Sequence, residues 1–489
     1  MSVDIPIAAQ PADPRDEQHR VRNSRTWEAP PAPLASVPAS VRVRARDGAV
    51  DLARAWCLTV VVVMHALMVG VTMGAGGPVL ENALEGWSGF APFTWFAQIM
   101  PLFFVLGGFS AHVQFTSLNS RGVTASGYIA LRMRRLLRPA LAAIAAIVLV
   151  LAVLTLLGTP ADIVAIAGFR LSQPLWFLGV YALTTAAVPL ALAAHRRAPW
   201  ASVGALAGLA ATVDIVRSAT GMAGIGFLNL VFVWLLVQQF GFWLAEDRMP
   251  RSRLAVAALA VAAYGSLALL CTFGVFSFDL LYDLNPPCFA LVLLGIGQLA
   301  LFRLFAPALR RMHALRPVNA IAGWINARAM TVYLWHMLVL VLLAGVLVLV
   351  ASGVGILGGA ELPALRSGEW WATRPLWLVC VIAAVALVVT ATSRWETAPA
   401  APADPKRPVG WGAASASALL AIAGVVVILV TGFTIVGGVV GLACIAAGLR
   451  LASGQPIVGS RVASEQPAGG VLPSLACSAS TRPAQPATE

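Results

Sequence analysis

The stretch DLARAWCLTVVVVMHAL, residues 51–67, shows both the membrane character of this chain and its unusual polar residues. It lies within an apolar segment, 50–74, that is long enough for a membrane-spanning helix, which needs about 20 such residues. The stretch nevertheless carries three ionisable residues, Asp51, Arg54 and His65. Ionisable groups inside a membrane helix are costly, so each of them is a functional candidate by default.

The rest of the chain has the same apolar character. Of 489 residues, 59% are hydrophobic and 11% are charged, whereas soluble domains carry about 25% charged residues. This composition excludes a soluble enzyme and a disordered protein. The net charge of +12 does not indicate nucleic-acid binding, because the basic residues are spread between long apolar segments. The predicted fold class is all-α, a polytopic integral membrane protein.

Hydropathy predicts twelve membrane helices. Ten of them are expected at 50–74, 92–115, 138–158, 174–194, 200–216, 222–245, 253–276, 286–307, 329–351 and 374–393. A further apolar stretch, 411–450, is long enough for two helices that turn near Gly432.

Composition also predicts how the chain is divided. We expect a ten-helix body at 49–395, a Pro-rich linker at 396–410 and a two-helix membrane appendage at 411–450. The segments 1–48 and 451–489 are rich in Pro and Ala and lack periodicity, so we expect two disordered tails.

Arginines alternate between the two sides of the predicted bundle. The N-terminal tail and the loops after every second helix are rich in Arg, whereas the opposite loops hold only Arg170, Arg217, Arg366 and Arg374. Basic loops remain on the cytoplasmic side of a membrane. We therefore expect a multi-pass protein of the inner (plasma) membrane with both termini in the cytoplasm.

Arg54 and His65 lie on one face of the first helix. They are eleven residues apart, which is about three helical turns and roughly 16 Å along the axis. An anionic ligand can therefore rest on Arg54 while its reactive end reaches His65. Asp51 lies one turn before Arg54 and can orient it. The alternatives are that Asp51 and Arg54 mark the helix boundary and that His65 is a structural, hydrogen-bonded residue.

A second arginine cluster occurs in YIALRMRRLLRP, residues 128–139. Arg132, Arg134, Arg135 and Arg138 precede the third predicted helix. The planar guanidinium binds phosphate groups through two parallel hydrogen bonds. A topological anchor that needs no ligand explains the cluster equally simply.

A third motif, MTVYLWHMLVL at 330–340, opens the ninth helix. Tyr333 and His336 are three residues apart and therefore share a face. The pair can bind an acceptor hydroxyl, or it can hydrogen-bond to a neighbouring helix.

The sequence predicts no metal site. The six cysteines form no CxxC pair, and the six histidines are scattered without an HExxH motif.

Together these motifs resemble membrane-bound acyltransferase family 3, the O-acyltransferases of sugars, glycolipids and some antibiotics. Arg54 and His65 match the family's Arg-ten residues-His motif, and MPLFFVLGGFS at 100–110 matches its second-helix pattern. Arg132 and Arg134 fit its Arg-x-Arg element, although Arg135 permits another register. TVYLWHM resembles its late-helix pattern. The resemblance covers roughly residues 46–393.

The resemblance implies a reaction and its partners. An acyl-CoA, usually acetyl-CoA, acts as co-substrate from the cytoplasm, with no other cofactor. Its phosphates are held by Arg54, Arg132, Arg134 and Arg135. His65 acts as general base or transient acyl acceptor toward a hydroxyl of a carbohydrate, lipid-linked or other cell-envelope molecule. His336 and Tyr333 are acceptor-side candidates, and Asp51 is a supporting one. No partner base or acid for His65 is assigned.

Two other classes of protein compete with this interpretation. A transporter or flippase also fits twelve helices, but we find no inverted repeat of the kind such proteins show. A non-catalytic scaffold leaves His65 and Arg54 on one helix face without a purpose.

Overall fold

The computed structural model describes residues 47–74, 77–351, 362–397 and 409–454. Most of the predicted tails, 1–46 and 455–489, and most of the predicted linker at 396–410 lie outside these residues. Within the described part, twelve helical segments are long and apolar enough to cross a membrane. The predicted all-α fold with twelve spans is therefore confirmed.

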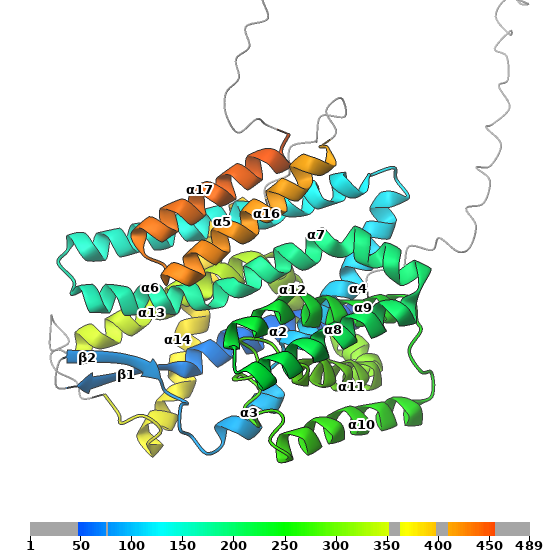
Figure 1. Cartoon of the computed structure of the whole chain (residues 1–489). Coiled ribbons are helices and arrows are strands. Elements are labelled where there is room, and N and C mark those ends of the chain that lie inside the picture. The colour runs from blue at the N-terminus through cyan, green and yellow to red at the C-terminus, as the bar shows by residue number, and fades with distance from the viewer. Residues whose placement is uncertain (1–46, 75–76, 352–361, 398–408, 455–489) are drawn as a thin grey trace, which may run out of the picture.

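The helices form one bundle in which successive membrane spans run in opposite directions (Figure 1), and Phe90–Asn119 and Ala161–Arg197 are single spans made of more than one helix. Its long elements are α2 (Gly48–Met68), α3 (Phe90–Ala97), α4 (Met100–Asn119), α5 (Ala125–Leu156), α6 (Ala161–Ser172), α7 (Trp176–Arg197), α8 (Pro199–Thr220), α9 (Asn229–Ala245), α10 (Arg253–Thr272), α11 (Ala290–His313), α12 (Arg316–Ala327), α13 (Ala329–Ala351), α14 (Gly368–Thr392), α16 (Trp411–Thr431) and α17 (Ile435–Ala452). The short helix α15 covers Arg394–Thr397.

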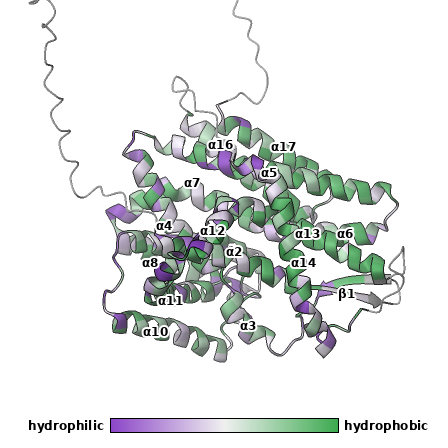
Figure 2. Ribbon diagram, turned by 180° about the vertical axis from the view of Figure 1, so that it is seen from behind, coloured by the Kyte–Doolittle hydropathy of each residue, from purple (hydrophilic) through white to green (hydrophobic). Residues whose placement is uncertain are grey.

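The outside of the bundle is apolar. Figure 2 shows hydrophobic residues along α13, α14 and α17 and hydrophilic residues gathered near α4 and α12. Large apolar side chains such as Leu156, Leu254 and Val430 are at least 80% exposed. Such a surface is suited to lipid rather than to water.

The first span is shorter than predicted. Helix α2 ends at Met68, and the residues up to 74 form strand β1 (Val69–Gly74), which pairs antiparallel with β2 (Gly77–Asn82). The predicted helix over 50–74 was therefore wrong at its end. The reason is local, because β1 (VGVTMG) combines two glycines, which are poor helix formers, with the β-branched residues Val69, Val71 and Thr72.

The third span starts earlier than predicted. Helix α5 begins at Ala125, where the Thr124 hydroxyl accepts a hydrogen bond from the backbone N–H of Gly127. Pro139 lies inside the helix instead of opening it. The arginine cluster, expected just before the helix, is therefore part of α5, and helical geometry fixes the direction of each arginine.

A break between α3 and α4 is bridged by a side chain of α11. The Gln298 carbonyl oxygen accepts from the backbone N–H of Leu102 at 3.0 Å, and its amide donates to the backbone carbonyl of Gln98 at 2.8 Å. Backbone groups that leave the helical pattern inside a membrane need such partners. This break allows α4 to enter the centre of the bundle.

Helices α4 and α9 pack backbone to backbone. A Cβ atom built on Gly108 would overlap the carbonyl oxygen of Gln238, and one built on Gly241 would overlap that of Val105. Small residues permit this close approach in membranes. The contact fixes the position of α4.

The last two helices pack onto the body. Gly432 ends α16 with a φ of 68°, and so confirms the predicted turn. Figure 1 shows α16 and α17 lying over α5 and α7. Gly448 of α17 packs against Leu137 of α5, and Val425 of α16 against Gly179 of α7. The pair predicted as an appendage thus covers one side of the body.

The α4–α9 contact can be tested with two neighbouring glycines. Gly108→Ala should lower the midpoint of thermal unfolding by several degrees, because overpacking costs about 1–3 kcal/mol. Gly107→Ala is the matched control, because a Cβ at Gly107 meets nothing within 4 Å. Equal midpoints for the two purified variants would contradict the described packing.

Candidate functional site

A cavity of about 510 Å³ opens among the helices at the end where α2, α5 and α13 begin. We call it the basic cavity, because four arginines line it, namely Arg54, Arg121, Arg132 and Arg135. Farther in, its wall becomes apolar, with Leu58 and Val61 of α2 and Phe103 of α4. The cavity therefore joins a cationic part to an apolar one.

Arg132 is held in place by two other helices. Its Nη1 donates to the Oε1 atom of Gln114 in α4 at 2.8 Å, and its Nη2 donates to the hydroxyl of Tyr181 in α7 at 3.0 Å. These contacts orient the guanidinium in the cavity wall. No sequence pattern connects the three residues, and neither Gln114 nor Tyr181 was predicted as a site residue.

The predicted arginines of α5 divide between two faces. Arg132 and Arg135 line the basic cavity, whereas Arg134 is only 5% exposed and is not part of its lining. At 100° per residue, Arg135 lies 60° from Arg132 around the helix, but Arg134 lies 160° away. The structure therefore brings Arg54, Arg132 and Arg135 together and leaves Arg134 out.

Three carboxylates also line the cavity, namely Asp47, Asp51 and Glu396. Asp47 caps α2 by accepting from the backbone N–H of Ala49, and it binds Arg310 through both oxygens. Glu396 accepts from the backbone N–H groups of Met330 and Thr331. Arg310 neutralises Asp47, so the four lining arginines outnumber the remaining carboxylates, Asp51 and Glu396, and give the cavity an excess of positive charge suited to an anion.

The support of Arg54 by Asp51 stays a prediction. Both residues line the basic cavity, one turn apart on α2. The backbone carbonyl of Asp51 accepts from the amide of Asn326 in α12 at 2.7 Å. This contact joins the start of α2 to the short helix before α13.

The two predicted histidines meet in the bundle, although they are far apart in the sequence. The ring centroids of His65 in α2 and His336 in α13 are 5.1 Å apart. His65 Nδ1 lies 2.8 Å from the carbonyl oxygen of Val61, and His336 Nδ1 lies 2.6 Å from that of Tyr333. A carbonyl only accepts, so each Nδ1 carries the proton and each neutral ring keeps a lone pair on Nε2.

The histidine pair lies just beyond the apolar end of the basic cavity. Val61 and Tyr333 line the cavity, and each lies one turn before one of the histidines on its helix. Neither His65 nor His336 is among the lining residues. The cavity thus leads from the arginines toward two imidazoles.

Tyr333 is positioned by its own contacts. Its hydroxyl donates to the carbonyl of Pro174, and its ring packs 4.7 Å from that of Phe177 and 5.8 Å from that of His336. Tyr333 and His336 therefore lie side by side, as their spacing predicted. The hydroxyl of Tyr333, however, is occupied by the backbone between α6 and α7.

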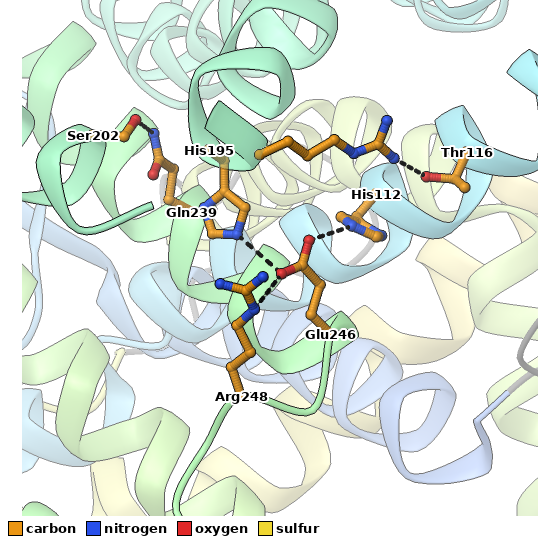
Figure 3. Close-up of polar contacts among 8 residues, drawn as sticks. His112, Thr116, His195, Ser202, Gln239, Glu246 and Arg248 are labelled. Atoms are coloured by element: carbon orange, nitrogen blue, oxygen red, sulfur yellow. Dashed lines mark hydrogen bonds and ion pairs between the residues drawn. The ribbon is translucent and has the colours of Figure 1, made fainter. Parts of the chain in front are cut away.

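A second buried polar cluster joins the ends of α4, α7 and α9. Figure 3 shows the Glu246 carboxylate between His112, His195 and Arg248, at 3.2, 3.5 and 2.7 Å from their nitrogens. His195 is fully buried. This cluster was not predicted from the sequence, because its histidines lie in two separate helices and its carboxylate directly follows a third. Among the described residues, no group of His, Cys, Asp and Glu is arranged to hold a metal ion.

The fold and the cavity define a polytopic membrane protein with an internal, arginine-lined site. The family model described as an acyltransferase domain, that of acyltransferase family 3, matches residues 47–393, well over half of the chain. The chain therefore belongs to this acyltransferase family. No curated protein and no solved structure matches it. The match covers the predicted ten-helix body and ends before α16.

The role of Glu246 as the centre of the second cluster can be tested by stability. Glu246→Gln keeps the shape of the side chain but removes the charge that Arg248 contacts. We expect a loss of about 1–3 kcal/mol of folding free energy, because the partly buried charge that His112 and Arg248 contact is lost. Thermal unfolding of the purified protein measures it, with Glu85→Gln in an exposed loop as control. An unchanged midpoint for Glu246→Gln would disprove the role.

Proposed function

We propose that this protein is an integral membrane O-acyltransferase that transfers an acyl group, most simply acetyl, from acyl-CoA to a hydroxyl group. The acceptor is a carbohydrate, a glycolipid or another cell-envelope molecule. The observation that carries the proposal is the basic cavity, whose apolar end leads to the imidazole of His65. Membership of the acyltransferase family supports it.

The cavity suits an acyl-CoA in both of its parts. Arg54, Arg121, Arg132 and Arg135 offer forked donors for the phosphate groups of the donor. The apolar wall formed by Leu58, Val61 and Phe103 suits the uncharged arm that leads to the thioester. The donor then enters arm first, with its phosphates on the arginines and its thioester near the histidines.

His65 is the proposed general base. Its Nδ1–H donates to Val61, so its Nε2 lone pair is available to take a proton. The acceptor oxygen attacks the thioester carbon, a C–O bond forms, and the hydroxyl proton moves to Nε2. The C–S bond then breaks, and the departing thiolate takes the proton from His65. Proton transfer of this kind contributes about 10²–10⁴-fold to a rate.

The proposed location is the inner (plasma) membrane, with both termini in the cytoplasm. Arg196, Arg248 and Arg310 lie at the end of the bundle where the basic cavity opens, as Arg121 does. Basic residues of this kind mark the cytoplasmic side. In this orientation the cavity faces the compartment that supplies acyl-CoA. We propose no metal or other cofactor, and beyond the donor and the acceptor only membrane lipid as a partner.

The base is tested by His65→Ala in cells that lack the wild-type gene. Mass spectrometry of glycan, glycolipid and small-metabolite fractions should show an acyl mass increment that wild type restores and His65→Ala does not. His313→Gln, a histidine of α11 outside the lining of the cavity, should restore it fully. If His65→Ala restored the increment as well, the base would have to be sought elsewhere. If no fraction differed, a transporter would explain the bundle better.

Donor binding is tested by two arginines of α5. Arg135→Gln should raise KM for acetyl-CoA about 10-fold, because a charge-assisted hydrogen bond contributes about 1.5–3 kcal/mol. Arg138→Gln is the matched control, because Arg138 does not line the cavity. The difference should shrink at high salt, which screens exposed charges. Equal KM values for the two variants would contradict the assignment of Arg135 to the donor.

A further inference from the structure

His336 has an unused hydrogen-bonding atom. The side chain is fully buried, and its Nε2 has no hydrogen-bond partner among the described residues. Buried polar side-chain atoms nearly always have a partner, so each exception needs an explanation.

The nature of the unused atom follows from the backbone. Because Nδ1 donates to the carbonyl of Tyr333, neutral His336 has a lone pair, and no proton, on Nε2. That atom can accept a hydrogen bond but cannot donate one. His65 is fixed in the same tautomer by Val61. In the resting state, therefore, neither of these two Nε2 atoms can donate to the other.

The hydrogen-bonding capacity of the pair changes when His65 takes up a proton. His65 then carries a positive charge and N–H groups on both nitrogens. The two rings are neighbours, with their centroids 5.1 Å apart and their planes tilted by 57°. A neutral imidazole with a lone pair beside a cation stabilises it, and the effect is large where water is excluded.

We infer that His336 is the positioning partner of His65 and stabilises its protonated form during acyl transfer. The inference rests on the proposed function and assigns the partner that the sequence left open. The proton that His65 accepts from the hydroxyl stays on His65 until the thiolate takes it. His336 exchanges no proton and forms no covalent bond. Its lone pair offsets the transient charge, so it acts on the chemical step and not on donor binding.

The test compares two substitutions of His336 in the full-length protein. His336→Leu removes the lone pair, whereas His336→Gln can return an acceptor oxygen near the position of Nε2. Trp335→Phe on the same helix is the control. The assay follows release of CoA thiol from acetyl-CoA in membranes of the native host, which contain the endogenous acceptor, across a range of pH.

The expected results separate a positioning role from a structural one. His336→Leu should lower kcat about 10- to 100-fold, in the range expected for a hydrogen bond to a charged group, and leave KM for acetyl-CoA within about 2-fold. It should also move the acidic limb of the pH profile to lower pH, because His65 then binds a proton less readily. His336→Gln should recover at least about 10-fold of the loss.

Several outcomes would overturn the inference. Equal kcat for the Leu and Gln variants, an effect confined to KM, or an unmoved pH profile would each do so. If His336→Leu does not accumulate, His336→Gln decides alone, and a kcat below about a tenth of wild type excludes the role. Failure of the proposed function would be recognised by a different result, because the His65→Ala variant would then release CoA thiol as fast as the wild type.

Discussion

The structure depends on one constraint, which is that backbone N–H and C=O groups need partners in a medium that supplies none. Twelve helices meet it along most of the chain. At the break between α3 and α4, Gln298 meets it with its own amide. Within the helices, the backbone carbonyls of Val61 and Tyr333 also accept hydrogen bonds from the rings of His65 and His336. The main chain therefore sets which nitrogen of each imidazole is left for chemistry.

The fold was largely predictable because the membrane imposes a length and a composition on every span. The twelve spans and the turn at Gly432 follow from hydropathy alone. Hydropathy does not report the conformation of a short apolar segment, so the strand Val69–Gly74 was read as helix. It also missed α6 and α12, which are too short to span. The start of α5 depends on the Thr124 cap, a single side chain that a hydropathy window does not detect.

The candidate site was predictable where it depends on one helix. Eleven residues of spacing placed Arg54 and His65 on one face, and the structure sets one in the cavity wall and the other just beyond it. Contacts between helices left no such signal. Gln114 and Tyr181 reach Arg132 from two other helices, and His336 meets His65 across 271 positions of sequence. Which arginines of α5 face the cavity could be predicted only if the helix was known to begin at Ala125, before the cluster.

Glu396 has a consequence for the order in which the protein matures. Its carboxylate caps the start of α13, binding Met330 and Thr331, although it follows α14 in the chain. Helix α13 therefore leaves the ribosome more than sixty residues before its cap exists. The helix that carries Tyr333 and His336 is then inserted with its first turn unfinished. The first turn of α13 therefore gains its cap only after the whole of α14 has been synthesised.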